Sequence, residues 1–317
     1  MAEPVGAGVG VGVLGTGIMG RRMLAALQKQ DRLAAVALWD PSPGALQLAQ
    51  PLAPHARLHA DSAALLADPA VQLVYIASPP SFHAQAVHAA LAAGRACLCE
   101  KPLTHDLAEA RALVAAVDAA GLPFAVNFPF ASSTPSRRLQ QIVARGELGD
   151  LLGAQIRLRF ARWPREWQAG ASAWLAGPAE GGFAREVLSH FVFLALRCFG
   201  PARVEGVRLE RLPGQAETAL QCRLVHAGVT VEVDAAVAGE VADDNRFLVR
   251  GSRGELSLSR WSSLQWQGQT LEQADGGPQM LQAFADWLQG RGPQGLATVQ
   301  EAAAVAQIIE TILAVDG

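Results

Sequence analysis

Over the first 126 residues, short apolar runs alternate with longer helix-like stretches. The predicted strands are residues 9–14, 34–39, 73–77, 97–101 and 124–126. The predicted helices are residues 21–29, 82–93 and 107–120. The last two helices run into Gly94 and Gly121, as helices often do at their ends. Strands that alternate with helices build parallel β-α-β units, so the pattern predicts an α/β domain with a doubly wound parallel sheet.

The pattern changes after a predicted helix at 137–144, which Gly146-Glu147-Leu148-Gly149 closes. Apolar and polar residues then alternate over 155–160, as in a strand with one solvated face. Further strands are predicted at residues 202–209, 219–226, 229–237, 246–250 and 255–258. The last two are joined by Gly251-Ser252-Arg253-Gly254, a hairpin signal. We expect a C-terminal α+β domain with a large, mostly antiparallel sheet. Helices can cover one face of it, and a second subunit covering the other would make a homo-oligomer, a dimer or tetramer.

The chain becomes helical again near its end, over 280–288 and 299–313. We expect these two helices, within 278–316, to pack back on the first domain. The predicted organisation is therefore a first domain over 1–125, with the C-terminal helices on it, and a substrate-binding and oligomerisation domain over 126–277.

Composition excludes several classes of function. The 317 residues are 50% hydrophobic and carry a net charge of −3, so there is no basic footprint for nucleic acid. No apolar run approaches the roughly 18 residues that span a membrane. The four cysteines of the chain are too few for a disulfide framework, and none has a partner at zinc-type spacing. We expect a cytoplasmic protein with buried free thiols at Cys97 and Cys99 and without a metal site.

A glycine motif stands between the first strand and the first helix. It reads Gly15-Thr16-Gly17-Ile18-Met19-Gly20. In such a motif the first glycine permits a tight turn, the second lets the backbone approach a pyrophosphate, and the third lets the helix pack close to the strand. The anion would rest on the helix N-terminus, where unpaired N–H groups point outward.

Asp40 ends the second strand, 20 residues after Gly20. An acidic side chain at this spacing can accept hydrogen bonds from a ribose 2′-hydroxyl and repels a 2′-phosphate. The motif therefore favours NAD over NADP. The alternative for Asp40 is a turn cap, because Pro41-Ser42-Pro43-Gly44 follows it.

Other polar residues also follow the strands. Ser78 and Pro79 follow the third strand, and Lys101 ends the fourth. Ligands of doubly wound sheets bind at the carboxyl ends of the strands. Lys101 is one of only two lysines among 26 basic residues, and a lysine can shift its pKa where an arginine cannot. His83, one turn into a helix, is either a cofactor contact or a packing histidine.

An unusual segment lies between the first two strands of the second domain. It carries Trp163, Trp167 and Trp174, three of the seven tryptophans, together with Arg165. The tryptophans alone are more typical of a core than of a binding wall.

After Gly181-Gly182-Phe183-Ala184-Arg185 comes a helix that carries Glu186 and His190, four residues apart and so on one helical face. A carboxylate there can orient the histidine ring. An ordinary surface pair at the same spacing is the alternative.

At this point the sequence resembles the Gfo/Idh/MocA family of NAD(P)-dependent oxidoreductases over nearly its whole length. The loop 15–20 resembles the cofactor loop of that family. Ser78-Pro79-Pro80-Ser81-Phe82-His83 resembles its Thr-Pro-Asn-x-x-His turn, with Pro80 in place of Asn. Glu100-Lys101-Pro102 matches its Glu-Lys-Pro signature, in which the lysine–proline bond is commonly cis.

The second half of the chain carries the resemblance further. The segment 146–149 resembles the entry to the substrate domain of the family, and 181–190 resembles its Gly-Gly-rich loop and catalytic helix. Three positions depart from the family pattern: Glu186 replaces an aspartate, Leu188 a glycine and Phe193 an aspartate.

The resemblance implies a Rossmann domain that binds NAD through the loop 15–20, Asp40, Ser78, Pro79, His83, Glu100 and Lys101. It implies hydride transfer between nicotinamide and a hydroxyl-bearing or carbonyl carbon of a small molecule such as a sugar, polyol or sugar acid. His190 would be the general base, and Lys101 would hydrogen-bond the same oxygen.

The resemblance also suggests roles around the histidine. Glu186 would orient His190 or bind a neighbouring hydroxyl. Trp163, Trp167 and Trp174 would form a substrate wall, and Arg165 or Arg185 would suit a carboxylate. The rival interpretation is a non-catalytic NAD(H)-binding sensor or scaffold, although such a protein would need neither Lys101 nor His190.

Overall fold

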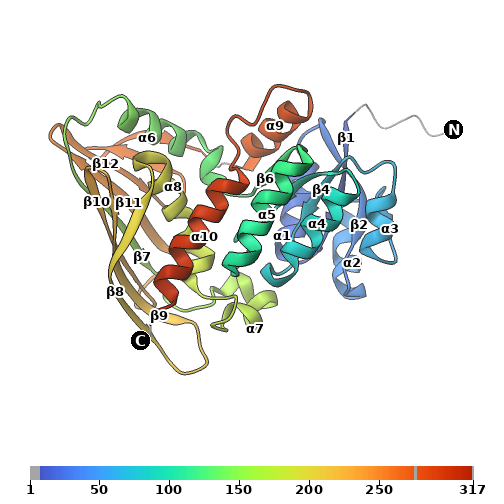
Figure 1. The fold of residues 1–317 in the computed structure, drawn as a ribbon, viewed down its shortest axis with the longest axis horizontal. Helices are drawn as coiled ribbons and strands as arrows, with labels where there is room; N and C mark the ends of the chain where they lie inside the picture. The colour runs from blue at the N-terminus through green and yellow to red at the C-terminus, as the bar shows by residue number, and fades with distance from the viewer. Residues whose placement is uncertain (1–7, 275–276, 316–317) are drawn as a thin grey trace. The chain divides into compact units, whose positions relative to one another are not determined.

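The structure is a computed structural model that describes residues 8–274 and 277–315 (Figure 1). Contacts within the chain divide it into two compact units, which we treat separately. Unit 1 comprises Met1–Phe128 and Gly277–Ala303, and unit 2 comprises Pro129–Gly276 and Ala304–Gly317.

Unit 1 is built on a sheet of six parallel strands in the order β3-β2-β1-β4-β5-β6. The strands are β1 (Val9–Leu14), β2 (Leu33–Trp39), β3 (Arg57–Leu58), β4 (Leu73–Ile76), β5 (Ala96–Cys99) and β6 (Phe124–Val126). The strand order reverses at β1, which has β2 on one side and β4 on the other. Ligands of such sheets bind at this switch point, outside the carboxyl ends of the strands. The predicted doubly wound sheet is confirmed.

The helices of unit 1 are α1 (Ile18–Leu27), α2 (Pro43–Ala49), α3 (Ser62–Ala67), α4 (His83–Ala92), α5 (Leu107–Ala120) and α9 (Gly277–Leu288). Phe284 of α9 packs in the same apolar cluster as Val13 and Leu24. Both ends of α5 lie where we predicted them, because specific residues cap the helix. The Asp106 side chain accepts hydrogen bonds from two backbone N–H groups of the first turn, and Gly121 ends the helix in the left-handed conformation. We did not predict α2, α3 or β3, which are too short to show a clear period.

Unit 2 is built on a sheet of eight strands in the order β14-β13-β12-β11-β7-β10-β9-β8. The strands are β7 (Leu151–Arg159), β8 (Ala202–Arg211), β9 (Glu217–His226), β10 (Val229–Ala236), β11 (Asp244–Gly251), β12 (Gly254–Ser259), β13 (Ser263–Trp266) and β14 (Gln269–Gln273). Neighbouring strands are antiparallel except for β7 and β10. The predicted mostly antiparallel sheet and its hairpin at Gly251 and Gly254 are confirmed.

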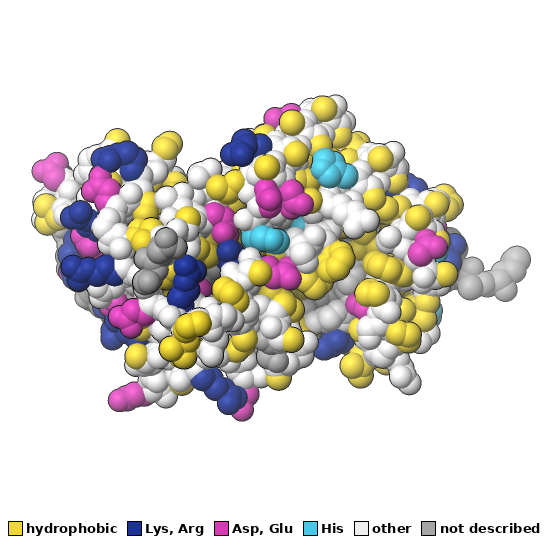
Figure 2. All heavy atoms as spheres, turned by 60° about the horizontal axis from the view of Figure 1, so that its bottom comes forward, with side chains coloured by type: hydrophobic (Ala, Val, Ile, Leu, Met, Phe, Trp, Pro, Cys, Tyr) yellow, Lys and Arg dark blue, Asp and Glu magenta, His cyan; other side chains and the backbone are white. Residues whose placement is uncertain are grey.

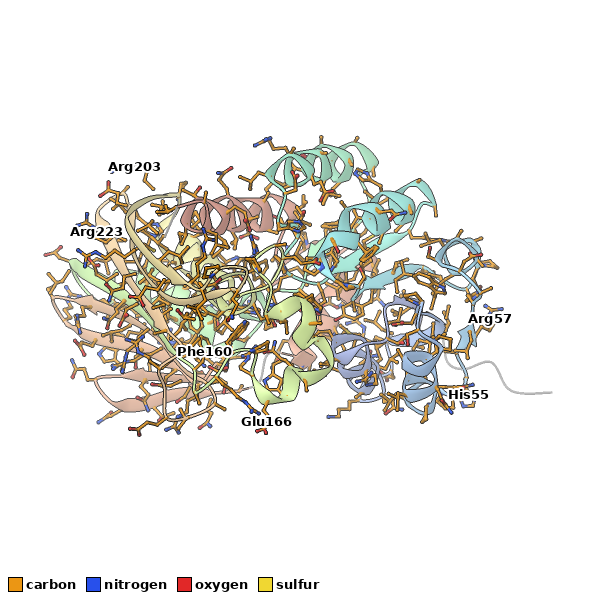
Figure 3. The ribbon with its side chains drawn as sticks, turned by 90° about the horizontal axis from the view of Figure 1, so that it is seen from below. His55, Arg57, Phe160, Glu166, Arg203 and Arg223 are labelled. Atoms are coloured by element: carbon orange, nitrogen blue, oxygen red, sulfur yellow. The ribbon has the colours of Figure 1, made fainter. Side chains whose placement is uncertain are left out.

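The two faces of this sheet differ in character. Ile156, Val231 and Phe247 are buried on one face, where α6 (Thr134–Ala144) contacts β12, β13 and β14. On the other face Arg203 and Arg223 project from β8 and β9, and both form ion pairs with Glu205 (Figure 3). A charged face can stay in water, so it does not by itself require a second subunit. The expected homo-oligomer stays a prediction.

Acidic and basic side chains are interspersed on the face of the molecule drawn in Figure 2. This distribution differs from the single basic stripe that marks nucleic-acid-binding proteins. None of the helices described is long and apolar enough to cross a membrane.

The last helix, α10 (Val299–Leu313), differs from expectation. Its residues from Ala304 onward group with unit 2, whereas we expected all of 278–316 to go with the first domain. One cause is Glu310, whose carboxylate pairs with the Arg185 guanidinium of unit 2 at 2.7 Å. The partners are far apart in the chain, so the sequence pattern could not show this contact.

Candidate active site

Two of the three glycines in the loop after β1 are required by close contacts with the backbone. Gly15 has φ +92°, and a Cβ there would lie 2.7 Å from the Ala77 carbonyl carbon. A Cβ on Gly20 would lie 2.2 Å from the Gly15 carbonyl oxygen. At Gly17, by contrast, a Cβ would meet nothing within 4 Å. The loop is therefore tight at its two ends and open at its centre, beside the N-terminus of α1. This shape suits a pyrophosphate, which needs close approach to backbone N–H groups.

Asp40 ties the end of β2 to this glycine loop. Its Oδ2 accepts hydrogen bonds from the Thr16 backbone N–H at 2.6 Å and from the Thr16 hydroxyl at 3.2 Å. Its Oδ1 accepts from the Ser42 N–H at 2.8 Å, so Asp40 does cap the following turn. A carboxylate has about four acceptor sites, so capacity remains for a ribose hydroxyl. The two readings of Asp40 are thus compatible.

Arg21 was not singled out from the sequence. It lies in the first turn of α1, and its Nη1 donates a hydrogen bond to the Thr16 carbonyl at 3.0 Å. This contact brings a positive charge to the glycine loop. A cation there complements a pyrophosphate, and the residues of the loop therefore fit a dinucleotide.

His83 joins the loops that follow β4 and β5. It is 1% exposed, and its Nδ1 and Nε2 each lie 2.9 Å from a carbonyl oxygen, that of Pro102 and that of Ser78. Burial lowers the pKa of His83, although both carbonyls act in the opposite direction. Both ring nitrogens lie beside carbonyl oxygens of the two loops, and the expected cofactor contact of His83 stays a prediction. His83 holds the two loops together.

Glu100 is buried and hydrogen-bonded within the protein, so it is not open to a cofactor. It is 5% exposed, and its Oε1 accepts hydrogen bonds from the Tyr75 hydroxyl and, at 2.6 Å, from the Asn127 amide. Lys101 follows it in the loop after β5, and the Lys101–Pro102 peptide is cis, as the resemblance implied. The expected cofactor contact through Glu100 is corrected to a buried anchor for the loop that carries Lys101.

Tyr75 provides a test of this buried anchor. Burial, and then the adjacent Glu100, raise the pKa of Tyr75 well above its ordinary value of 10.0. The folded state thus favours the neutral phenol, so the stability it contributes is present below pH 10.0 and is lost as the pH rises further. Because Tyr75 is the only tyrosine of the chain, phenolate absorbance reports on it alone. We expect phenolate to appear only together with loss of the circular dichroism signal.

The control for this titration is Tyr75→Phe, which should remove the absorbance change. Phenolate that forms near pH 10.0 in protein that is still folded would contradict the assigned anchor.

The helix that carries His190 starts irregularly. A π-helical turn, Ala184–Leu188, leads into α8 (Ser189–Phe199). The Glu217 side chain of β9 accepts a hydrogen bond from the Ala184 N–H at 2.6 Å, and burial raises the pKa of Glu217. Gly182 has φ +96°, and a Cβ there would lie 2.3 Å from a Glu217 carboxylate oxygen. The glycine therefore makes room for the carboxylate that caps the helix, and π-turns are frequent at functional sites.

His190 is 7% exposed and packs among aromatic rings of unit 2. The Trp261 ring centroid lies 5.3 Å from that of His190, with the two planes 89° apart. The Phe130 centroid lies 6.1 Å away, also edge to face. We did not single out Trp261 or Phe130 from the sequence, because isolated aromatic residues carry no motif.

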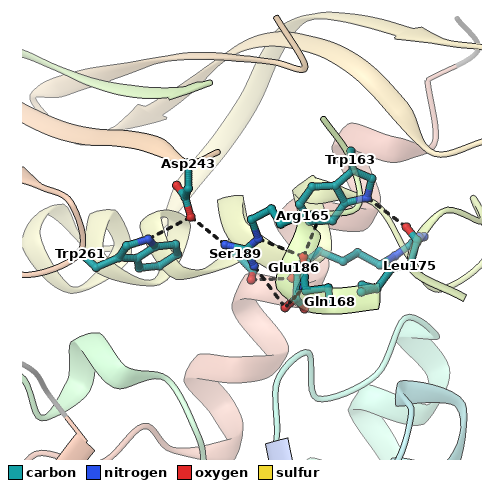
Figure 4. A network of polar contacts seen from close by, with 9 residues as sticks. Trp163, Arg165, Gln168, Leu175, Glu186, Ser189, Asp243 and Trp261 are labelled. Atoms are coloured by element: carbon teal, nitrogen blue, oxygen red, sulfur yellow. Dashed lines mark hydrogen bonds and ion pairs between the residues drawn. The ribbon is translucent and has the colours of Figure 1, made fainter. Parts of the chain in front are cut away.

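Arg165 is buried in a polar network beside this helix (Figure 4). Its Nη1 lies 2.7 Å from Asp243 Oδ2, and its Nη2 lies 3.7 Å from Glu186 Oε1. Gln168 accepts a hydrogen bond from Arg165 Nε at 2.9 Å and donates one to Glu186 at 3.1 Å. The charge of Arg165 is already compensated by two carboxylates. We therefore correct the expectation that it binds a substrate carboxylate.

The Arg185 guanidinium also has partners within the protein. It forms a bidentate pair with Glu310, with both N–O distances 2.7 Å. It also donates hydrogen bonds to the carbonyls of Pro178 and Gly181 at 2.8 and 3.0 Å. These donors hold the glycine-rich loop and α10 in place, and the expected role of Arg185 in substrate binding stays a prediction.

The three tryptophans of the insert have different environments. Trp163 donates a hydrogen bond to the Leu175 carbonyl at 3.0 Å and packs against Phe160 and Phe183, which are buried. Trp163 is itself partly exposed, and its expected place in a substrate wall stays a prediction. Trp167 is 41% exposed, with the Arg165 guanidinium 4.8 Å from its ring centroid, and Trp174 is partly exposed. These two stay candidates for a substrate wall.

The structure also bears on the cysteines and on metal binding. Cys97 and Cys99 are buried, as predicted, and burial raises the pKa of Cys97 to about 12. Among the described residues there is no group of three or more His, Cys, Asp or Glu side chains placed to hold a metal ion.

Comparison with known proteins agrees with this description. The model of an oxidoreductase family with an NAD-binding Rossmann fold, GFO_IDH_MocA, matches residues 9–128. The GFO/IDH/MocA C-terminal domain matches residues 136–257.

Two curated relatives and one solved structure illustrate the similarity. D-apiose dehydrogenase of Paraburkholderia graminis is 32% identical over 149 residues, 47% of this chain and 40% of that protein. Inositol 2-dehydrogenase of Streptomyces avermitilis is 37% identical over 145 residues, 44% of this chain and 42% of that protein. The matches thus span less than half of each relative. The structure of GenD2 from gentamicin A biosynthesis in complex with NAD shares the fold, with TM-score 0.83, 22% identity, and 98% of this chain and 94% of that chain covered.

Proposed function

Because the chain belongs to the Gfo/Idh/MocA oxidoreductase family, we propose that it is an NAD-dependent dehydrogenase or reductase acting on a CH–OH group. The substrate class we propose is a sugar, a polyol or a related sugar acid. The observation that carries the proposal lies within unit 1. Gly15 follows β1 and Lys101 follows β5, and the carboxyl ends of these parallel strands lie on one edge of the sheet. A sensor would need the glycine loop but not a lysine on the same edge.

We assign the cofactor to the loop 15–20, with Arg21 beside the pyrophosphate, Asp40 at the adenosine ribose, and Ser78 and Pro79 at the end of β4. When bound, the nicotinamide ring supplies the hydride chemistry. Ser78 supports this assignment, since its hydroxyl oxygen is buried and has no hydrogen-bond partner among the residues that the structure describes.

We assign proton transfer to His190, and stabilisation of the charge on the substrate oxygen to Lys101. In the oxidising direction His190 takes the proton of the substrate hydroxyl, and in the reducing direction it returns it. The Lys101 ammonium donates a hydrogen bond to the substrate oxygen and stabilises the negative charge that develops there. Glu186 already interacts with Gln168 and Arg165, and we keep for it the role of orienting His190 or binding a neighbouring hydroxyl.

The proposal is tested with purified protein, NAD and a substrate panel. The panel contains D-apiose, D-xylose, myo-inositol and an aldonic acid, and NADH absorbance reports turnover. Turnover of at least one member supports a dehydrogenase. Tight NADH binding without turnover of any member would favour the sensor.

Cofactor choice is a separate prediction that rests on Asp40. Asp40→Asn keeps an oxygen for the Thr16 N–H but removes the charge that favours a ribose hydroxyl and repels a 2′-phosphate. We expect NADH affinity to fall about tenfold, since a hydrogen bond to a charged group is worth about 1.5–3 kcal/mol. NADPH affinity should rise or stay the same. Nicotinamide fluorescence titrations of both cofactors measure the change.

The matched control is Asp31→Asn, which changes an exposed aspartate that follows α1 and should affect neither titration. A parent protein that prefers NADPH, or an unchanged affinity ratio in Asp40→Asn, would show that Asp40 does not select the cofactor.

A further inference from the structure

The turn between β12 and β13 holds two residues in a conformation that bulky side chains rarely adopt. Arg260 has φ +50° and Trp261 has φ +66°. Left-handed backbone at a bulky residue is a genuine outlier and persists only where surrounding contacts enforce it. Glycine would relieve this strain at either position, yet the chain has a tryptophan there.

Neighbouring side chains hold Trp261 in place at two atoms. The Trp261 backbone N–H donates to Asn245 Oδ1 at 3.0 Å, and the indole Nε1–H donates to Asp243 Oδ2 at 3.1 Å. Asn245 is 1% exposed and also donates to Asp243 Oδ1 at 2.8 Å. The turn is thus fixed by a buried amide and a carboxylate, and the same carboxylate oxygen pairs with Arg165 at 2.7 Å.

The fixed indole packs on the histidine of α8. Its ring centroid lies 5.3 Å from that of His190, and the planes are almost perpendicular. Trp261 also contacts Phe191 and Phe130, with centroids 5.5 and 5.8 Å away. An edge-to-face contact of this kind favours one relative orientation of the two rings.

We propose that Trp261, held by Asp243 and Asn245 in the left-handed turn after β12, is a positioning residue that fixes the ring orientation of His190. The proposal rests on the proposed function, because it assigns a support to the proposed general base. Trp261 acts through His190 and need not touch the substrate. A proton-transfer group must be aligned with its target, so a displaced ring slows the chemical step more than it weakens binding.

The kinetic test compares three variants. Trp261→Ala removes the ring and should lower kcat by about 10- to 100-fold, with KM changed by less than about threefold. Trp261→Phe restores an aromatic ring and should recover most of kcat. Arg260→Gly is the control, because it relieves backbone strain at the neighbouring exposed residue without touching His190, and it should leave kcat unchanged while raising the melting temperature.

Three outcomes would overturn the proposal. The first is a parent-like kcat in folded Trp261→Ala. The second is a change confined to KM, which would make Trp261 a substrate wall. The third is an equal loss of kcat in Arg260→Gly, which would implicate the turn rather than the ring.

A second readout does not depend on turnover. The imidazole resonances of the seven histidines can be resolved by NMR, and His190→Gln assigns that of His190. Loss of the indole should move the His190 resonance in Trp261→Ala and not in Arg260→Gly. An unmoved resonance would overturn the positioning role even if no substrate is found, whereas a moved resonance in an inactive parent would locate the failure in the proposed function.

Discussion

Replacing His190 by alanine is expected to lower kcat by about 10²- to 10⁴-fold, the usual contribution of a positioned general acid or base. The cofactor should still bind, because the glycine loop and Asp40 belong to unit 1 and His190 belongs to unit 2. His190→Gln is the more stringent variant. It fills much of the same space beside Trp261 but cannot exchange a proton at neutral pH.

Steady-state kinetics with the best panel substrate measure this effect, and NADH fluorescence confirms binding. The control is His88→Ala, which removes an exposed histidine of α4 and should leave kcat unchanged. If His190→Gln turns over at the parent rate with cofactor bound, His190 is not the proton-transfer group.

Lys101→Met is expected to lower kcat by about 10²- to 10³-fold, the cost of removing one preorganised donor to a developing oxyanion. Methionine keeps an unbranched chain of similar length but has neither charge nor N–H groups. The fold should tolerate it, because Glu100 remains anchored by Tyr75 and Asn127. Product formation under saturating NAD measures the loss.

The chain offers a matched control for this variant, since Lys29 is its only other lysine and is exposed. Lys29→Met should be fully active. The same pair allows a labelling test, in which an amine reagent modifies both lysines and NADH protects Lys101 only. Equal turnover in both methionine variants would remove Lys101 from the mechanism.

Sequence reasoning works best at positions whose conformation depends on residues nearby in the chain. Gly15 and Gly20 were predictable as glycines because backbone atoms lie against both, as the 2.2 Å approach at Gly20 shows. Lys101 was singled out because it follows a buried strand and is a rare lysine, and its role in the site stays a prediction. The position of Asp40 was predictable, because the motif places an acidic residue about 20 residues after the glycine loop. Its hydrogen bond from the Thr16 N–H joins the end of β2 to that loop.

The sequence was least informative where a charge is compensated by a residue far away in the chain. Arg165 and Arg185 were expected to bind a substrate carboxylate, but Asp243 and Glu310 neutralise them from 78 and 125 residues away. A single sequence does not show which acid an arginine meets. Trp261 was missed for a related reason, since a left-handed tryptophan has no signature in the sequence and depends on Asn245 and Asp243.

Hydride transfer itself can be followed with NADH that carries deuterium at both C4 positions. With a keto or aldehyde form of a panel substrate, we expect the label on the new carbinol carbon by mass spectrometry, and we expect Lys101→Met and His190→Gln to transfer it far more slowly. NADH that binds tightly but keeps all of its label with every substrate would contradict the proposed dehydrogenase and leave a cofactor-binding protein without hydride transfer.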